Sequence, residues 1–432
     1  MTDTIGGRTR GATRIAVTGF GAVTPHGGSA FASWNGVRCG RRAMHTLPLE
    51  ALLPTGWTPP GDWPLEWRRW AGGRVPADDA DVARCMVSPT DPVVRYAHTA
   101  VAEAVEASRL GANAVDPARV ATVIGTSKGG LASFANVVAS VDPLLARPQD
   151  IWGQLPPDCA ARSIAAHYGW CGPSLSPVAA CATGLMAMIR GAALIREGAC
   201  DVAVAGSSDA SLLLAVLASF RRLGVLAAVD DHPELACRPF DLNRRGFLPG
   251  EGAGVLVLER WEHAIARGAP IHAEWVDGLF RSDPAGITVL PEDPRRLSRL
   301  IADLLIRCAI RPADVDLVSL HGTGTEMNDR YEARGLRQAL GPALDAAACF
   351  GIKGSCGHLL GAAGSVETVI GLHALRDQIA PPTVNCDNPD PELAIPLDHA
   401  QATSRPAAHL LKLSLGFGGH LAAAVLRRTN GN

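Results

Sequence analysis

Short apolar segments alternate with longer helical patterns along the whole chain. In the first half the pattern predicts strands over 14–20, 120–124, 201–205 and 252–259, and helices over 30–37, 92–109, 156–168, 210–220 and 261–267. In the second half it predicts strands over 271–277, 315–320, 410–415 and 422–426, and helices over 294–310, 330–340 and 365–376. The strands are apolar on both faces, which is typical of sheets covered by helices on both sides. We therefore expect an α/β fold of two halves with a boundary near residue 268.

Two stretches depart from this alternation. Residues 1–13 are polar and glycine-rich, which predicts a disordered leader. Residues 39–92 hold many prolines and several tryptophans and show little periodicity. We expect a long loop that is packed by its own aromatic rings, in preference to the alternative of a partner surface.

The stretch Pro177–Gly206 contains the most apolar helical pattern of the chain. The predicted helix has almost no polar face, and it ends in a basic residue followed by glycine at Arg196–Gly198. A helix that is apolar all round lies in the core of a sizeable protein. Cys181 lies at its start, where free backbone N–H groups and the helix dipole favour a thiolate. We therefore expect Cys181 to be a nucleophile with a lowered pKa, although most cysteines of such a chain are inert core residues.

Composition narrows the class of protein. The chain has 432 residues, 47% of them hydrophobic and 19% charged, as in a compact globular enzyme. A formal net charge of −2 argues against nucleic acid as a partner, and no apolar run is long enough to predict a membrane span. The odd number of cysteines, 11, without a CxxC pair fits reduced thiols, so we expect a cytoplasmic protein.

Three further loops carry side chains that could act with a thiol. His321–Thr325 follows a predicted strand, where ligand sites of α/β sheets form. Lys353–His358 precedes a glycine-rich turn and Glu367, and a Lys and a Glu in apolar surroundings are expected to pair. Leu415–Gly419 is a glycine-rich turn after a strand. Each loop also has a plain structural interpretation: a tight turn with a surface histidine, a surface lysine beside a core histidine, or a simple hairpin.

The order of these motifs gives a specific resemblance. The chain resembles an elongating β-ketoacyl-acyl carrier protein synthase, a condensing enzyme of the thiolase fold, from about residue 14 to 428. The motifs that carry the resemblance are TGFGAVTPHG at 18–27, AACATG at 179–184, RPFDLNRRGFLPGEGAGVLVLE at 238–259, HGTGTEMND at 321–329, IKGSCGHLLGAAG at 352–364 and SLGFGG at 414–419.

The resemblance implies a fold, a reaction and partners. The fold would have two similar α/β halves in a five-layered α-β-α-β-α core, with Cys181 in residues 14–268 and both catalytic histidines in 269–428. The reaction would be decarboxylative condensation of an acyl-enzyme with malonyl-acyl carrier protein, in fatty acid or type II polyketide synthesis. The enzyme would bind no cofactor or metal of its own, because its substrates are carried on phosphopantetheine. Its partners would be acyl carrier protein and a second copy of the chain, or a related subunit in a heterodimer.

The resemblance also implies roles for single residues. Cys181, His321 and His358 would form the catalytic triad, with Lys353 supporting them through pairs with Glu367 and Asp329. Further residues would bind substrate: Thr323 and Thr325 through the phosphopantetheine arm, and Phe417 and Gly418 at the glycine-rich turn, where Phe417 would act as a gate.

Other functions are weighed against this one. A catalytically inactive partner that sets chain length, in which the nucleophile is commonly replaced by glutamine, is disfavoured by Cys181. A non-decarboxylating thiolase or acyltransferase is disfavoured because no second cysteine lies near the C-terminal glycine turn. The spacing of the triad gives no support to a metal site. Residues 42–92 and 280–295 match the family poorly, which leaves the acyl substrate and the carrier-docking surface open; Arg68, Arg69, Arg221 and Arg222 are candidates for that surface.

Overall fold

The computed structural model describes residues 13–59, 61–64, 67–83, 91–111, 114–139, 152–397 and 400–429. The predicted leader, residues 1–13, lies outside the described residues except for its last position. Within the described ranges, no helix has both the length and the apolar character needed to cross a membrane.

Ten strands form one mixed sheet in the order β10-β9-β13-β14-β8-β1-β7-β6-β4-β5. Five come from the first half: β1 (Ile15–Val23), β4 (Val120–Gly125), β5 (Ser174–Leu175), β6 (Val202–Asp209) and β7 (Gly252–Arg260). The other five are β8 (Ala273–Ser282), β9 (Leu317–Ser319), β10 (Ala348–Phe350), β13 (His409–Gly416) and β14 (His420–Arg428). Two short antiparallel pairs lie outside this sheet: β2 (His45–Leu47) with β3 (Trp70–Gly72), and β11 (Ile379–Ala380) with β12 (Thr403–Ser404).

The two halves of the sheet have the same topology. Counted in chain order within its half, the first strand lies innermost, followed outward by the fifth, fourth, second and third. The outer three strands of each half run parallel, and the inner pairings are antiparallel. A short antiparallel pairing of Ile15–Val17 with Ala273–Trp275 joins the halves. The prediction of two similar α/β halves is therefore confirmed.

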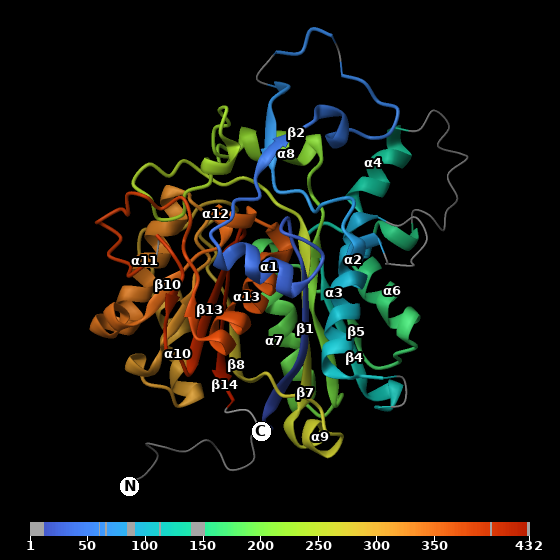
Figure 1. Cartoon of the computed structure of the whole chain (residues 1–432), viewed down its shortest axis with the longest axis vertical. Coiled ribbons are helices and arrows are strands. Elements are labelled where there is room, and N and C mark those ends of the chain that lie inside the picture. Colours follow the sequence, from blue (N-terminus) through green and yellow to red (C-terminus); the bar gives the residue numbers. More distant parts are fainter. Residues whose placement is uncertain are drawn as a thin grey trace.

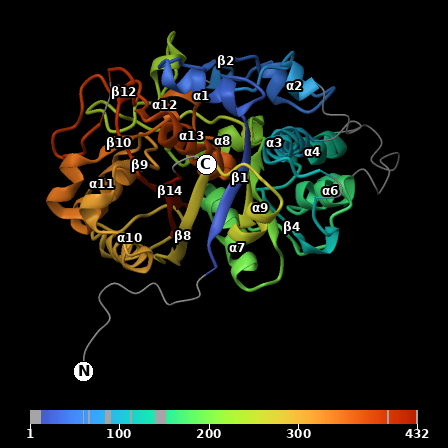
Figure 2. The same cartoon turned by 60° about the horizontal axis from the view of Figure 1, so that its bottom comes forward.

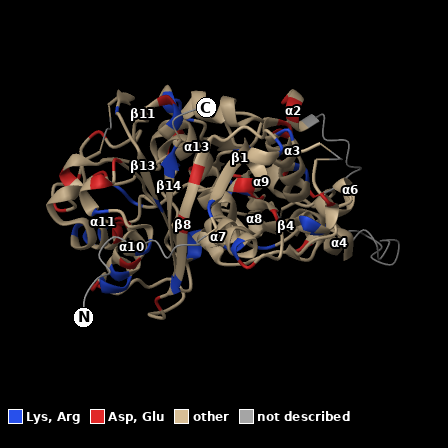
Figure 3. Ribbon diagram, turned by 90° about the horizontal axis from the view of Figure 1, so that it is seen from below, with Lys and Arg blue, Asp and Glu red and all other residues tan. Residues whose placement is uncertain are grey.

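Helices complete five layers. Helices α7 (Thr183–Arg196) and α13 (Ala363–Asp377) pack against each other between the two halves (Figures 1 and 2). Outside the first half lie α3 (Pro92–Ser108) and α6 (Cys159–Tyr168), and outside the second half lie α10 (Arg295–Cys308) and α11 (Glu326–Leu340). The central helices carry far fewer charged residues than α10 and α11, as Figure 3 shows. This pattern follows from burial, because only the outer helices keep one face in water.

The remaining helices surround this core. They are α1 (Ala30–Arg38), α2 (Ala80–Ala83), α4 (Leu131–Ala139), α8 (Leu214–Arg222), α9 (Trp261–Ala266) and α12 (Lys353–Cys356). In the irregular stretch 39–92 the rings of Trp57 and Trp63, and of Trp67 and Trp70, pack at centroid distances of 5.8 and 6.1 Å. The expectation that aromatic rings pack this stretch is confirmed.

Several predicted boundaries are wrong. Helix α11 begins at Glu326, earlier than predicted, because the Thr325 side chain accepts the N–H of Asn328 and caps it. Helix α8 begins only at Leu214, later than predicted, and α6 begins only at Cys159. Strand β10 and helix α4 were not predicted; β10 has only three residues, too few for a period to emerge.

The central helix α13 lies directly on strand β7. A Cβ atom placed on Gly254 of β7 would lie 2.5 Å from the backbone nitrogen of Val366. A Cβ on Gly364 would likewise lie 2.9 Å from the backbone nitrogen of Leu185 on α7. The backbone of α13 therefore packs directly against the backbones of β7 and α7. These close contacts bring the starts of both central helices together.

Replacing Gly254 by alanine should therefore destabilise the protein. Overpacking of this kind typically costs about 1–3 kcal/mol, because backbone must move to admit the methyl group. The free energy of unfolding in urea measures the change. Gly111→Ala is the matched control, since nothing lies within 4 Å of a Cβ at that position; equal stabilities of the two variants would contradict the close contact.

Candidate active site

Cys181 lies in a tight turn at the start of α7. It is the middle residue of the 3₁₀ helix η5 (Ala180–Ala182), which leads directly into α7. The preceding Ala180 has φ = +47°, a left-handed conformation that is uncommon for a residue other than glycine. Thr183 holds this turn, since its hydroxyl donates to the carbonyl of Ala180 and accepts the N–H of Ala179. The thiol is thus presented from a fixed, strained backbone.

His358 contacts the sulfur of Cys181. Its Nε2 lies 3.1 Å from Cys181 Sγ, and its ring packs edge-on against Phe247 at a centroid distance of 4.9 Å. The backbone N–H of His358 donates to the carbonyl of Leu248. Its Nδ1 is buried and has no hydrogen-bond partner among the described residues, so none of them fixes the proton at this nitrogen.

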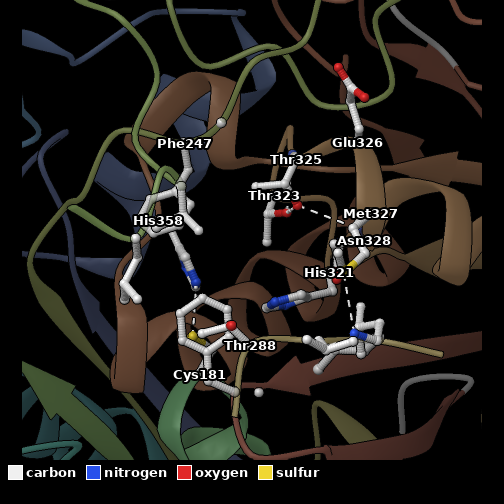
Figure 4. A pocket seen from close by; sticks show the side chains of 18 of the residues that line it. Cys181, Phe247, Thr288, His321, Thr323, Thr325, Glu326, Met327, Asn328 and His358 are labelled. Atoms are coloured by element: carbon white, nitrogen blue, oxygen red, sulfur yellow. Dashed lines mark hydrogen bonds between the residues drawn. The ribbon is translucent and has the colours of Figure 1, made fainter. Parts of the chain in front are cut away.

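His321 approaches the same site from the second half. It follows β9, and Glu332 on α11 accepts the backbone N–H groups of His321 and Gly322 at 2.6 and 2.8 Å. The rings of His321 and His358 lie 5.4 Å apart and nearly perpendicular, and Figure 4 shows both beside Cys181. Lys353 Nζ lies 3.3 Å from His321 Nδ1. Because an ammonium only donates, Nδ1 accepts and the ring hydrogen of neutral His321 lies on Nε2.

A buried carboxylate connects two lysines behind the histidines. Glu367 on α13 pairs with Lys353 at 2.5 Å through one oxygen and with Lys412 on β13 at 2.6 Å through the other. All three side chains are almost fully buried. Lys353 also donates to the backbone carbonyl of His321. The expected pair of Lys353 and Glu367 is present, and Lys353 holds the His321 loop through its backbone carbonyl.

The expected pair between Lys353 and Asp329 is wrong. Asp329 accepts the backbone N–H groups of Phe240, Thr323 and Gly324, at 2.8, 3.0 and 3.2 Å. From the first turn of α11 its carboxylate thus bonds the loop 321–325, and no ion pair joins it to Lys353 among the described residues. Asp329 therefore shapes the loop that carries both threonines.

Burial controls the protonation of the site. It lowers the pKa of both His321 and His358 well below the usual value, and the positive charge of Lys353 lowers them further. Burial also raises the pKa of Cys181 to about 11, against the lowering effects of Lys128, Lys353 and a backbone hydrogen bond from Phe417. The prediction of a lowered cysteine pKa is therefore wrong for the resting protein: desolvation outweighs the favourable position at the helix start. The resting site contains a thiol and two neutral imidazoles.

These side chains open into one cavity of about 390 Å³. The residues that line it include Cys181, His321, His358, Thr323, Thr325 and Phe417. The two threonine hydroxyls lie 2.8 Å apart, and the labelled threonines lie above His321 in Figure 4. Gly418 does not line this cavity, whereas its neighbours Gly416 and Gly419 do. Lys353, Glu367 and Asp329 lie outside its lining.

Sequence reasoning missed several residues of the site. The segments Leu223–Val225, Arg245–Phe247 and Ile287–Leu290 all line the cavity. The last segment lies in a loop without a recognisable motif, so it gave no signal. Lys412 could have been found from the sequence, because a lysine inside the apolar strand 410–415 requires a buried partner. Among the residues that the structure describes, no group of histidine, cysteine and acidic side chains could hold a metal ion.

The sequence matches two family models. Residues 12–264 match the family described as Beta-ketoacyl synthase, N-terminal domain, and residues 272–387 match Beta-ketoacyl synthase, C-terminal domain. A 3-oxoacyl-(acyl-carrier-protein) synthase 2 of Rhizobium meliloti (strain 1021) is 34% identical over 432 residues, which cover 97% of this chain and 100% of the relative. The ketoacyl synthase alpha subunit of the tetracenomycin polyketide synthase of Streptomyces glaucescens is 32% identical over 426 residues, covering 96% and 97%.

Solved structures of ketosynthases share the whole fold. A type II polyketide synthase acyl-carrier protein in complex with its ketosynthase bound to the hexaketide has a chain that matches with a TM-score of 0.84 and 28% identity, over 97% of this chain and 100% of that one. The ishigamide ketosynthase/chain length factor matches with a TM-score of 0.86 and 26% identity, over the same shares. The fold is thus that of the thiolase-like ketosynthases. The chain therefore belongs to the β-ketoacyl synthase family, whose members are condensing acyltransferases of fatty acid or polyketide synthesis.

Proposed function

We propose that this enzyme transfers an acyl group from a carrier protein to Cys181 and condenses it with a decarboxylated malonyl-carrier protein. The observation that carries the proposal is the convergence of Cys181, His358 and His321 in one buried cavity, with 3.1 Å between His358 Nε2 and Cys181 Sγ. A thiol is a weak nucleophile until its proton is removed, and His358 is the base within reach. The product is a β-ketoacyl-carrier protein.

The acylation step uses His358 as a proton shuttle. Because Nδ1 of His358 has no partner among the described residues, the ring can accept the thiol proton on Nε2 without breaking another hydrogen bond. The sulfur of Cys181 then attacks the acyl thioester, and the carrier thiolate leaves with the proton from His358. Acyl-enzyme and free carrier thiol are the products, as in ping-pong catalysis.

The decarboxylation step needs neutral donors. Malonyl thioester loses CO₂, and the electron pair of the broken C–C bond develops as negative charge on the thioester oxygen. Nε2–H of His321, fixed by Lys353, is placed to donate to that oxygen. Nε2 of His358 donates to it after the ring changes tautomer, losing its proton at Nδ1 and gaining one at Nε2, a change that no described partner of Nδ1 opposes. Two neutral imidazoles donate without a change of net charge, which is why the lowered pKa of both rings suits this role.

The condensation step closes the cycle on Cys181. The enolate carbon attacks the acyl carbonyl, and the C–S bond to Cys181 breaks once the tetrahedral intermediate collapses. The backbone N–H of Phe417 hydrogen-bonds the sulfur of Cys181, which supports its role as an oxyanion donor together with the N–H of Cys181. The released thiolate takes a proton from water, and the resting thiol is restored.

The cavity suits a carrier-bound substrate. We assign the phosphopantetheine arm to Thr323 and Thr325, whose hydroxyls lie on the lining beside His321. Arg221 and Arg222 directly precede Leu223, which also lines the cavity. Arg221 stacks on Trp70 at 3.6 Å and donates to the carbonyl of Arg69, so these cations lie together beside the cavity. We assign docking of an acidic carrier protein to this surface, and a second copy or a related subunit remains the expected partner chain.

Substitution of the triad should separate the two chemical steps. Cys181→Gln should abolish condensation while malonyl-carrier protein is still decarboxylated. His321→Ala and His358→Ala should each slow decarboxylation by about 10²–10³-fold, the usual cost of one oxyanion donor. Release of labelled CO₂ and mass spectrometry of the carrier measure both reactions. Acyl transfer without any CO₂ release in the wild type would sink the proposal in favour of a non-decarboxylating acyltransferase.

The thiol of Cys181 should become more reactive with rising pH. With a pKa of about 11, its thiolate fraction increases roughly tenfold per pH unit between pH 7 and 9. The rate of iodoacetamide addition to the Cys181 peptide, followed by mass spectrometry, should rise in that proportion. Exposed Cys39 serves as an internal reference; a rate at Cys181 that is flat above pH 7 would show a preformed thiolate instead.

Carrier docking can be tested without touching the cavity chemistry. Arg69 is exposed, and its backbone carbonyl accepts a hydrogen bond from Arg221. Arg69→Glu should raise KM for the carrier substrate several-fold, mostly through slower association, and leave kcat nearly unchanged. Steady-state kinetics at low and high salt measure this effect. Arg311→Glu, on an exposed residue of the second half, is the matched charge control, and an equal change in both variants would rule out a specific docking role.

A further inference from the structure

A cluster of polar side chains around Lys128 has no role in the steps above. Lys128 follows β4, and its ammonium donates to Ser127 Oγ at 2.6 Å and to Ser211 Oγ at 3.0 Å. The carboxylate of Asp209 lies 3.8 Å away. Asp209 and Ser211 are each only 2% exposed. A cluster of polar side chains is costly to bury unless each side chain in it has a hydrogen-bond partner.

The carboxylate in the cluster is fully engaged. Asp209 accepts hydrogen bonds from the hydroxyls of Ser127 and Ser211 and from the backbone N–H of Gly361 at 3.1 Å. The ammonium is not fully engaged: it has three donor hydrogens, and the described residues supply two hydroxyl acceptors for it. The side chain of Lys128 is 27% exposed. One N–H of Lys128 is therefore available to an acceptor that the protein does not supply.

The cluster packs against the turn that carries His358. A Cβ placed on Gly361, three residues after His358, would lie 2.8 Å from Asp209 Oδ2 and 2.9 Å from Ser127 Cβ. After burial, the charge of Lys128 has the largest effect on the pKa of Cys181, which it lowers. It also lowers the pKa of His358. The turn Leu360–Ala362 also packs against the turn Ala180–Ala182 that carries Cys181. Lys128 therefore lies near the nucleophile, yet it does not line the cavity assigned to the carrier arm.

An acyl group on Cys181 needs space outside that cavity. Leu131 and Leu213, a few residues beyond Lys128 and Ser211, line a second cavity of about 1050 Å³ whose other lining residues are mostly apolar. The polar cluster and this cavity are thus neighbours along the chain. An acyl chain on Cys181 that ran between them would meet an oxygen-binding group near the thioester and apolar surroundings farther away.

We propose that Lys128 binds a keto oxygen of the acyl group on Cys181 and thereby selects oxygenated acyl chains over saturated ones. The inference rests on the function proposed above and names its substrate class. A neutral keto oxygen fits better than a carboxylate, because Asp209 already balances the charge of Lys128. Selection follows from desolvation: a saturated chain that covers Lys128 would displace water from its third N–H and leave that N–H without an acceptor.

The test compares acyl donors of equal length. Wild-type enzyme, Lys128→Met and Lys128→Arg are acylated by hexanoyl-, 3-oxohexanoyl- and adipoyl-carrier protein, and kcat/KM for formation of the acyl-enzyme is measured by mass spectrometry. We expect the wild type to prefer 3-oxohexanoyl over hexanoyl by about tenfold or more, the usual effect of a hydrogen bond to a charged donor. Lys128→Met should remove this preference, mainly by improving hexanoyl transfer, and Lys128→Arg should restore part of it.

A second variant guards against an indirect effect. Lys128→Met leaves the carboxylate of Asp209 without a counter-charge, so the double variant Lys128→Met/Asp209→Asn keeps the local charge balanced. It should show the same loss of preference as Lys128→Met. An equal fall of all three donors in both variants would overturn the inference and make Lys128 a positioning residue for Cys181.

The remaining outcomes separate this inference from the proposed function. A preference for adipoyl would overturn the keto assignment in favour of a carboxylate, and a preference for hexanoyl would overturn it altogether. Release of CO₂ from malonyl-carrier protein by Cys181→Gln tests the proposed function alone, since that variant carries no acyl group. If CO₂ is released and the wild type does not discriminate among the donors, only the role of Lys128 fails.

Discussion

The chemistry of this site depends on one buried carboxylate that two lysines share. Glu367 lies between Lys353 and Lys412. Its one negative charge offsets only one of the two lysine charges, so the three side chains together produce a positive potential at the histidines. That potential adds to desolvation and keeps protons off both rings. Removing Glu367 would leave two buried ammonium groups without a counter-charge, which is among the most costly changes in a protein interior.

The two histidines differ because only one of them is tied to this network. His321 takes a hydrogen bond from Lys353 on Nδ1, so its tautomer is fixed and its cavity-facing nitrogen is always a donor. Nδ1 of His358 meets no partner among the described residues, so its Nε2 can accept a proton and later donate one. The hydrogen bond from Lys353 thus makes His321 a fixed donor, whereas His358, which lacks such a bond, can carry a proton.

Much of the fold and the triad could be predicted from sequence, and the misses have physical causes. The alternation of apolar strands and helices predicted both halves. The start of an apolar helix indicated Cys181, a loop after a strand indicated His321, and the resemblance to condensing enzymes added His358 and the roles of all three. The electrostatics could not be predicted, because the pKa of Cys181 depends on how deeply neighbouring segments bury it. Asp329 was misplaced for a similar reason: its partners are backbone groups of a loop whose path sequence does not reveal. The loop between β8 and α10 reaches the cavity through Ile287–Leu290 without any periodic signal.

The repeated topology of the two halves extends to the starts of the central helices. Helix α7 follows the 3₁₀ helix Ala180–Ala182, and α13 follows the 3₁₀ helix Leu360–Ala362. The first residues of these two 3₁₀ helices, Ala180 and Leu360, have positive φ angles of +47° and +49°. Cys181 and Gly361 hold the middle position of these turns. A cysteine at Gly361 would collide with Asp209 and Ser127, so the second turn can only be bare. The two halves therefore place equivalent turns at the centre of the molecule, the first with the nucleophile and the second with a glycine, while both imidazoles come from the second half.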